Sequence, residues 1–326
     1  MVLTPAPPIL SLRGLTLEVV GRGSRRRVLE DVSLDLRRAQ TLAVVGESGS
    51  GKTLTALALL QLTGAAARIT NGSLRFHDEE ILGASPERLC ELRGRHLGMI
   101  FQAPQAALNP VMDVASQVAE PLVTHRGLTW RQARLQVRRL FDEVGLSTSY
   151  CDRHTFAHEL SGGLAQRVMI AMALAGEPEV LIADEPTTAL DTTVQAQILQ
   201  LLTAVQRRHQ MAMLFVTHDL ALVAAVADDV AVMYGGRIVE TGAARSVCRQ
   251  PRHPYTAALW KSSARLAAGR LVPIQAPVGE PDQRGCPFAP RCPRRAARCT
   301  VEAPRLDDGV ACFYPLPAPD DLRDKQ

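Results

Sequence analysis

Aromatic side chains are scarce in this chain: Phe, Trp and Tyr make up 4% of its 326 residues, although 46% of the residues are hydrophobic. Proteins that hold single-stranded nucleic acid stack the bases on aromatic platforms, so this scarcity argues against that class of protein. A large charge of one sign is also missing, because the formal net charge is only +4. Arginines do cluster at 25–27 and between Arg284 and Arg305, and we interpret these clusters as solvated faces and expect no nucleic-acid partner.

Long apolar runs are missing as well. No run approaches the roughly 18 residues that a membrane-spanning helix needs, because charged residues such as Glu177 and Asp184 interrupt the longest candidates. The proline-containing N-terminus lacks the charged and apolar regions of a secretory signal. We therefore expect a cytosolic protein that associates with a membrane only through partner subunits.

The cysteines lack the close C-x2-C pairs of ordinary zinc ribbons. Seven thiols in a cytosolic chain should be reduced, and three scattered ones, Cys90, Cys151 and Cys248, are interpreted as ordinary buried or surface thiols. The other four crowd into the tail with the spacing C-x5-C-x6-C-x12-C: Cys286, Cys292, Cys299 and Cys312. Four thiolates could bind zinc or an iron–sulfur cluster, or the thiols could remain unligated.

Short apolar runs alternate with helical patterns along the rest of the chain. Strands are predicted at Ile9–Leu12, Leu15–Val20 and Val32–Leu36, and Asn71–Gly72 is predicted to be a hairpin turn. From about Pro104 to Ala175 the pattern becomes helical, and Ser161 stands where a capping residue would begin a helix.

The later strands end in residues that can carry chemistry. Val180–Ala183 and Met211–Val216 are apolar strands separated by a helical segment. This order predicts an α/β fold with parallel strands and crossover helices, in which ligands bind at the carboxyl ends of the strands. Gly235–Gly236 should join the last two strands in a hairpin.

Composition changes near residue 245. Of the 21 prolines, 12 lie from Pro251 onward. A tail so rich in Pro and Arg should bury little apolar surface, so it needs another source of order, which a bound metal could supply. We predict one domain over residues 1–245, with a helical subdomain at about 103–176, and a C-terminal extension over 246–326.

A phosphate-binding loop of the G-x-x-x-x-G-K-[ST] type follows the apolar run Thr41–Val45 and precedes a helix-forming run. Its residues are Gly46, Glu47, Ser48, Gly49, Ser50, Gly51, Lys52 and Thr53. Backbone N–H groups of such a loop and the positive end of the helix that follows bind phosphate. Lys52 should reach the β and γ phosphates of ATP, while Thr53 and Asp184, the latter at the end of a strand, should hold Mg²⁺.

Three further motifs follow the loop in order: Leu-Ser-Gly-Gly at 160–163, Leu-Ile-Ala-Asp-Glu-Pro at 181–186, and His218. Together with the loop they resemble the ATP-binding cassette (ABC) ATPases of membrane transporters. The resemblance implies that Glu185 is the general base for the attacking water, that His218 contacts the γ phosphate, and that Gln102 senses Mg²⁺ and water. It also implies that Asp191 belongs to a loop that crosses a dimer interface.

The resemblance implies a different role for Ser161, Gly162 and Gly163. In cassette ATPases two domains pack head to tail, and this signature motif closes over the nucleotide that the other domain holds. The start of a helix offers N–H groups and positive charge to the γ phosphate.

Two departures from the family pattern stand out. Relatives stack adenine on an aromatic residue upstream of the loop, but residues 1–40 contain none, and Val19 or Val20 occupies that place. Losing such a stack costs about 1–3 kcal/mol, so weaker base discrimination is expected. The signature also continues as Leu164-Ala165, where relatives carry a Gln or Met and then a polar residue.

Other segments resemble dipeptide and oligopeptide importers in particular: Gln105–Pro110, His158–Glu159, Gln166–Leu174, His253–Thr256 and Gly285–Pro293. This implies an ATPase subunit at the cytoplasmic face of the cell membrane, working with a second cassette ATPase, two permeases and an extracytoplasmic binding protein. Some relatives carry a [4Fe-4S] cluster in the tail, which favours that cofactor over zinc. An alternative is that the chain has the same ATPase role in an importer of nickel, a metallophore or an opine. A second alternative is that it is a soluble ABC ATPase in DNA repair or translation.

Overall fold

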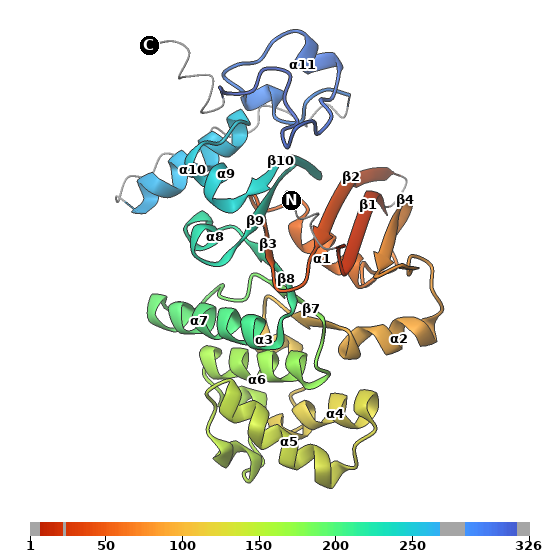
Figure 1. Cartoon of the computed structure of the whole chain (residues 1–326), viewed down its shortest axis with the longest axis vertical. Coiled ribbons are helices and arrows are strands. Elements are labelled where there is room, and N and C mark those ends of the chain that lie inside the picture. The colour runs from red at the N-terminus through yellow and green to blue at the C-terminus, as the bar shows by residue number, and fades with distance from the viewer. Residues whose placement is uncertain (1–6, 22–23, 268–283, 318–326) are drawn as a thin grey trace, which may run out of the picture. The chain divides into compact units, whose positions relative to one another are not determined.

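The computed structural model describes residues 7–21, 24–267 and 284–317 (Figure 1). The first six residues, and the parts of the Pro-rich tail at 268–283 and 318–326, lie outside the described residues. The chain forms two compact units that interleave along the sequence. One is built mainly from Arg75–Val216, and the other from Ser11–Asp35, Leu42–Leu74 and the described residues from Thr217 onward.

Parallel strands form the sheet of the first unit. The strands β8 (Ala212–Thr217), β7 (Val180–Asp184) and β6 (Leu97–Ile100) are neighbours in that order, and both pairs are parallel. Every residue of β7 and β8 is buried, as expected for strands that are covered on both faces. The predicted parallel strands are confirmed, and their carboxyl ends meet at one edge of the sheet.

Helices make up most of the rest of the first unit (Figure 1). They are α2 (Pro86–Arg95), α3 (Pro104–Ala107), α4 (Val114–Arg126), α5 (Trp130–Glu143), α6 (Gly162–Ala175) and α7 (Thr192–His209), with 3-10 turns η1 (Thr148–Cys151) and η2 (Ala157–Glu159). The helices α4, α5 and α6 pack on one another. A capping box of Thr129 and Gln132 starts α5, and Ala133, Val137 and Phe141 bury one face of it. The helical pattern predicted from about Pro104 to Ala175 is confirmed.

The strands β2 (Arg25–Leu36), β1 (Leu10–Val20) and β4 (Ala67–Phe76) lie side by side in that order, and β5 (Glu79–Glu80) pairs with the end of β4. Two predictions are wrong here. The first two predicted strands are one strand, which passes through Gly14. Asn71–Gly72 is not a turn but lies inside β4. Gly72 is needed because a Cβ there would come within 2.9 Å of the Leu15 Cα, so the pair marks a close approach of two strands.

A second set of elements completes the other unit: β3 (Thr41–Val45), α1 (Lys52–Leu59), α8 (Leu220–Val226), β9 (Asp229–Tyr234), β10 (Arg237–Ala243), α9 (Ala244–Arg249), α10 (Pro254–Ala267), η3 (Ala289–Arg291) and α11 (Arg298–Val301). The strand β9 pairs with β3 in parallel and with β10 antiparallel. Gly235 and Gly236 have φ of 56° and 79° and form the turn between β9 and β10, so the predicted hairpin is confirmed.

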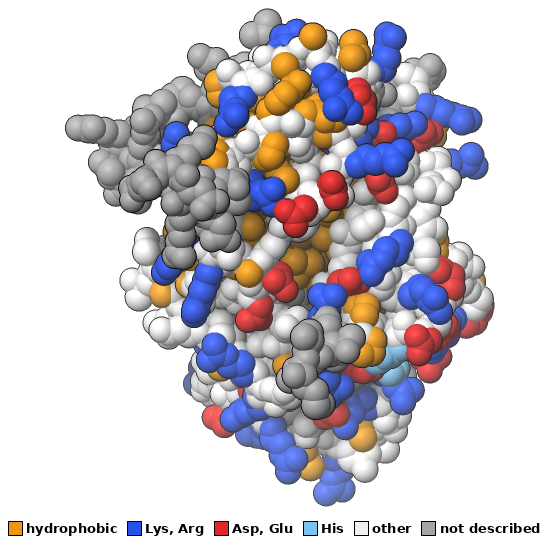
Figure 2. Space-filling model, turned by 45° about the horizontal axis from the view of Figure 1, so that its top comes forward, with side chains coloured by type: hydrophobic (Ala, Val, Ile, Leu, Met, Phe, Trp, Pro, Cys, Tyr) orange, Lys and Arg blue, Asp and Glu red, His pale blue; other side chains and the backbone are white. Residues whose placement is uncertain are grey.

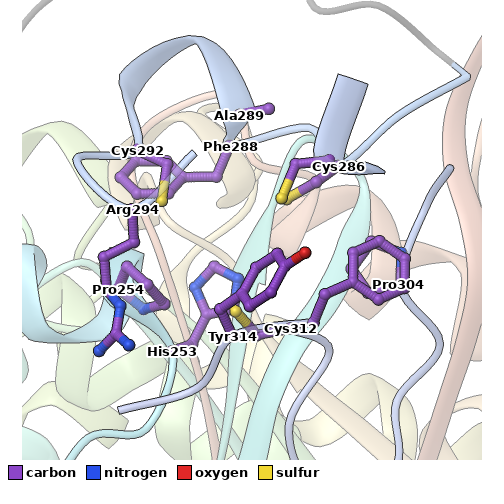
Figure 3. Close-up of a pocket in the computed structure, with 12 residues that line it drawn as sticks. His253, Pro254, Cys286, Phe288, Ala289, Cys292, Arg294, Pro304, Cys312 and Tyr314 are labelled. Carbon is purple, nitrogen blue, oxygen red and sulfur yellow. The ribbon is translucent and has the colours of Figure 1, made fainter. Parts of the chain in front are cut away.

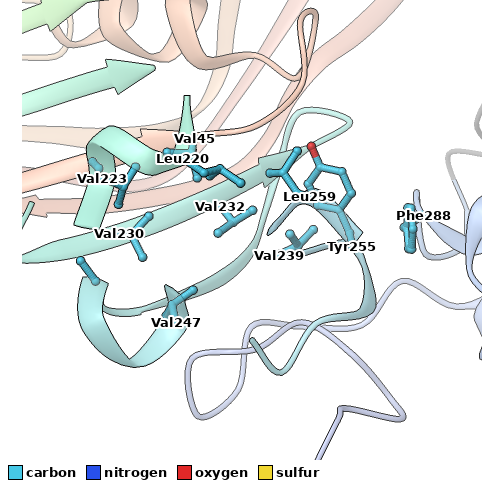
Figure 4. Close-up of a cluster of buried hydrophobic side chains, with 12 residues drawn as sticks. Val45, Leu220, Val223, Val230, Val232, Val239, Val247, Tyr255, Leu259 and Phe288 are labelled. Atoms are coloured by element: carbon cyan, nitrogen blue, oxygen red, sulfur yellow. The ribbon is translucent and has the colours of Figure 1, made fainter. Parts of the chain in front are cut away.

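One hydrophobic cluster joins the tail to this unit (Figure 4). Val45, Val232 and Val239 contribute from β3, β9 and β10, and Phe288 contributes from the tail with 1% of its surface exposed. The expectation that the tail buries little apolar surface is therefore wrong at this point. Burying a Phe side chain stabilises a fold by about 1.5–3 kcal/mol, so Phe288 contributes to the order of the tail.

The surface carries charges of both signs. On the face shown in Figure 2, Lys and Arg side chains are interspersed with Asp and Glu, in keeping with the small net charge. Within the described residues, none of the helices combines the length and the apolar character that crossing a bilayer requires.

Candidate functional site

The phosphate loop connects β3 to α1. Gly46 has a φ of 158° and passes so close to β9 that a Cβ would lie 2.2 Å from the carbonyl oxygen of Met233. Gly51, with a φ of 109°, is the residue before the first turn of α1. These conformations and contacts exclude side chains, so the glycines keep the loop tight enough for successive N–H groups to converge on an anion.

Lys52 is held inside this loop. The residue is 5% exposed, and its Nζ donates to the carbonyl oxygens of Gly46 and Glu47, at 3.0 Å each. A buried ammonium next to loop carbonyls is already desolvated, so phosphate oxygens can replace the carbonyls as its partners. Thr53 follows it in the first turn of α1.

The candidate general base stands at the carboxyl end of β7. Asp184 is 2% exposed and ends the strand, and Glu185 follows with a φ of 46°. The Gln102 amide Nε2 donates to Glu185 Oε2 at 3.0 Å, and the Thr188 hydroxyl donates to the same oxygen at 3.0 Å. The structure thus brings together two of the predicted residues, Gln102 and Glu185, from positions 83 apart in the chain.

Sequence reasoning missed Thr188. The signal was local, because a residue three positions after Glu185 can return to it in a turn, and the Thr188 N–H does donate to the Glu185 carbonyl oxygen at 3.1 Å. A carboxylate held by two donors is fixed in place and can accept a proton from a water molecule.

His218 follows β8 directly and is exposed. Its neighbour Asp219 caps α8 by accepting from the N–H of Ala221 at 2.9 Å, and the Asp219 N–H donates to the Thr217 hydroxyl at 3.0 Å. These contacts fix the backbone on both sides of the histidine.

The signature motif begins α6, and the predicted cap is confirmed, because the Ser161 hydroxyl accepts from the N–H of Leu164 at 3.4 Å. A Cβ on Gly163 would lie 2.7 Å from a methyl group of Val194, so the helix start packs closely on α7. Asp191 caps α7, accepting from the N–H of Val194 at 2.9 Å. The signature serine is exposed, so it can contact another molecule.

Val19 and Val20, which stand where the resemblance implies an aromatic residue, end β1, and Val20 is 43% exposed.

All four tail cysteines line one pocket, together with His253, Phe288 and Arg294 (Figure 3). The sulfur atoms of Cys286, Cys292 and Cys312 point toward the space that they surround.

All seven cysteines of the chain are free thiols. The pKa of Cys286 is raised to about 11, mainly by burial and in smaller part by the neighbouring cysteines. Burial also raises the pKa of Cys292 and of Cys312, so these thiols are protonated at neutral pH. In the described part of the chain, no group of three or more His, Cys, Asp or Glu side chains is arranged to hold a metal ion.

Comparison with known proteins gives two family matches. The ABC transporter family matches residues 29–188, and the oligopeptide/dipeptide transporter C-terminal region matches residues 239–299. The oligopeptide transport ATP-binding protein OppD of Escherichia coli is 43% identical, covering 88% of each chain. The dipeptide transport ATP-binding protein DppD of Bacillus subtilis is 40% identical, covering 89% of this chain and 88% of that protein.

Solved structures agree with these matches. The ATP-binding cassette MJ0796, in a dimeric post-hydrolysis state with ADP and Pi, has a TM-score of 0.65 and 25% identity, covering 72% of this chain and 99% of that chain. The protein cbiO1 of Clostridium perfringens, part of the ABC transporter complex cbiONQ, has a TM-score of 0.65 and 25% identity, covering 81% of this chain and 97% of that one.

Proposed function

Because this chain belongs to the ABC transporter ATPase family and carries the C-terminal region of its oligopeptide and dipeptide branch, we propose that it hydrolyses ATP to power peptide import. The observation that carries the catalytic part is Glu185, a carboxylate at the end of a parallel strand that Gln102 and Thr188 hold in place. Phosphoryl transfer needs positioned groups and charge neutralisation more than covalent chemistry, and this chain supplies such groups.

Each residue has a role in the proposed reaction. Lys52 binds the β and γ phosphates, and the Thr53 hydroxyl and Asp184 carboxylate would hold Mg²⁺, which neutralises charge on the phosphate oxygens. Glu185 accepts the proton of the attacking water, and Gln102 orients that carboxylate. His218 contacts the γ phosphate from the end of β8.

The proposed working unit is larger than this chain. A second cassette ATPase would offer its signature motif to the nucleotide bound here, while Ser161, Gly162 and Gly163 would serve the nucleotide of the partner. Exposure of Ser161 at the start of a 14-residue helix supports this role. Two permeases and an extracytoplasmic binding protein would complete the importer, with this subunit peripheral on the cytoplasmic face of the membrane.

We propose that residues 1–245 form the cassette and that the extension from 246 binds a [4Fe-4S] cluster through Cys286, Cys292, Cys299 and Cys312. The support for this proposal is that four thiols line one pocket with Arg294 beside them, although in the described residues their side chains are not grouped as they would be around a metal ion. Zinc held by the same four thiolates is the alternative. The proposed cluster would bind the four cysteines as thiolates and add order to the tail.

Purification from the native membrane tests the proposed assembly. The tagged chain should copurify with a second cassette ATPase and two permeases, and a peptide-loaded binding protein should stimulate ATP hydrolysis in proteoliposomes. Stimulation by a nickel chelate or an opine, and not by peptides, would favour the alternative cargo. Copurification with nucleic-acid enzymes in place of permeases would contradict the transporter assignment.

A further inference from the structure

Glu47, the second residue of the phosphate loop, is held by residues from the far end of the chain. Its N–H donates to the hydroxyl of Tyr255 at 2.9 Å, across 208 positions of sequence. Its carboxylate receives both terminal nitrogens of Arg291, at 2.7 and 2.9 Å, across 244 positions. Two-point pairing of this kind fixes the orientation of both groups, which a single contact does not.

The peptide group between Gly46 and Glu47 is held by hydrogen bonds at both its carbonyl oxygen and its N–H group. Its carbonyl oxygen accepts from Lys52 Nζ, and its N–H donates to Tyr255. Tyr255 therefore helps to set the orientation of the same loop peptide that the phosphate-binding lysine contacts.

Both residues of the extension are rigidly supported. Tyr255 is fully buried, and its ring lies 4.6 Å from that of Tyr234 and 5.4 Å from that of Phe288, centroid to centroid. The Arg291 guanidinium lies 5.6 Å from the Tyr234 ring centroid and donates to its hydroxyl at 3.2 Å. Aromatic packing and stacked guanidinium contacts restrict these side chains to one arrangement.

The charges of Glu47 and Arg291 connect this arrangement to phosphate binding. A carboxylate within a phosphate loop repels the phosphates that the loop binds, because like charges at close range disfavour each other. The side chain of Arg291 is 6% exposed and that of Glu47 is 32% exposed, so solvent screens the pair only in part. Arg291 supplies the compensating positive charge.

We propose that Arg291 and Tyr255 are positioning residues of the phosphate loop, through which the C-terminal extension sets nucleotide affinity. This inference rests on the proposed function, because it assumes that the loop binds ATP. Arg291 and Tyr255 act through Glu47, by neutralising its carboxylate and orienting its peptide.

The test is a double-mutant cycle on the full chain. Titration calorimetry measures the affinity of each variant for the slowly hydrolysed analogue ATPγS in the presence of Mg²⁺. Arg291→Gln should weaken binding about tenfold, a typical coupling for a charge pair. Glu47→Gln should bind at least as tightly as the wild type, and the Glu47→Gln/Arg291→Gln double variant should recover most of the loss. Tyr255→Phe, which keeps the ring and removes the acceptor, should weaken binding by a smaller factor.

Arg295→Gln is the matched control, because Arg295 is an exposed arginine in the same segment, and it should bind like the wild type. A wild-type chain that does not bind ATPγS would contradict the proposed function itself. Wild-type binding together with an unaffected Arg291→Gln, or a double variant as weak as Arg291→Gln alone, would overturn the positioning role. If thermal denaturation shows that Arg291→Gln is unfolded, Glu47→Gln and Tyr255→Phe decide: weaker binding by the first, or unchanged binding by the second, overturns the proposal.

Discussion

Glu185 adopts a backbone conformation that non-glycine residues rarely occupy, with a φ of 46°. Ala189, four residues later in the same loop, has a φ of 65°. Such conformations cost about 1–3 kcal/mol each and persist only where the surrounding contacts hold them. At Glu185 those contacts are the hydrogen bonds from Gln102 and Thr188. The loop is therefore less stable than a relaxed one, and this strain accompanies the placement of one carboxylate.

Glu185→Gln should keep nucleotide binding and slow hydrolysis about 10²–10⁴-fold, because the amide cannot accept the proton of the water. Lys52→Ala should instead weaken binding. Thr188→Val is the matched control, since it removes one donor and leaves the carboxylate, and its loss of rate should be smaller. ATP affinity and phosphate release measured on the three variants separate these effects, and near-normal hydrolysis by Glu185→Gln would remove it from the role of base.

Glu240 predicts a pH dependence of stability. Burial raises the pKa of the Glu240 carboxyl group above its ordinary value of 4.5. The backbone N–H groups of Arg252 and His253, which donate to the carboxylate at 2.7 and 2.9 Å, lower the pKa but by less than burial raises it. The folded state therefore holds this proton more tightly than the unfolded chain does. The stability that this confers is fully present below pH 4.5 and is lost as the pH rises through the raised pKa.

The measurement compares melting temperatures of the wild type and Glu240→Gln across that range. The wild type should lose stability relative to the glutamine variant as the pH rises above 4.5. A constant difference between the two proteins would contradict the assigned shift.

At the scale of elements, motifs that are contiguous in sequence were predictable. The phosphate loop, the Ser161 cap and the Gly235–Gly236 hairpin each depend on local backbone preferences, which a short stretch of residues expresses fully. Asn71–Gly72 shows the limit of this reasoning. The same dipeptide that favours a turn also suits a strand that passes close to another strand, and only the tertiary structure distinguishes the two.

The signature helix α6 gives an element-scale prediction. Ser161→Ala in this chain should impair hydrolysis at the nucleotide site of the partner cassette more than at its own, because the start of α6 serves the partner. Removal of one preorganised donor commonly costs about 10²–10³ in rate. Mixed dimers in which only one site can hydrolyse ATP measure each site separately.

Ser147→Ala is the control for the loss of a helix cap, because Ser147 caps η1 in the same unit. It should leave both sites active. If Ser161→Ala disables the Lys52 site of its own chain and spares the partner, the head-to-tail arrangement is wrong.

At the scale of the whole molecule, the residues that sequence analysis missed are those with distant partners. Nothing local marks Arg291 or Tyr255 as neighbours of Glu47, since pairing over more than 200 positions depends on the folded core. Phe288 was missed for a related reason. The Pro- and Arg-rich composition of the tail gives no sign that Phe288 packs into the hydrophobic cluster formed with residues of β9 and β10.

The tail cysteines give a whole-molecule prediction. Anaerobically purified protein should contain about four iron and four sulfide per chain if a [4Fe-4S] cluster is bound, or about one zinc if the site is structural zinc. Cys292→Ser should lose the metal and make the tail sensitive to protease, and it should also weaken ATPγS binding, because Cys292 adjoins Arg291. Cys90→Ser, a change at an exposed thiol, is the control. A metal-free wild type with a protease-resistant tail would contradict both metals.

The contact between Glu47 and Arg291 also bears on the order in which the protein is synthesised. The ribosome releases the phosphate loop long before it reaches Arg291, 244 positions later. The contact cannot form until Arg291 has been synthesised and has left the ribosome. A nascent or prematurely terminated chain therefore holds a loop whose carboxylate is not yet neutralised, and it should capture nucleotide poorly. Full nucleotide affinity would therefore arise only after residue 291 has been synthesised, and a chain that ends earlier should bind nucleotide at least about tenfold more weakly, as expected for Arg291→Gln.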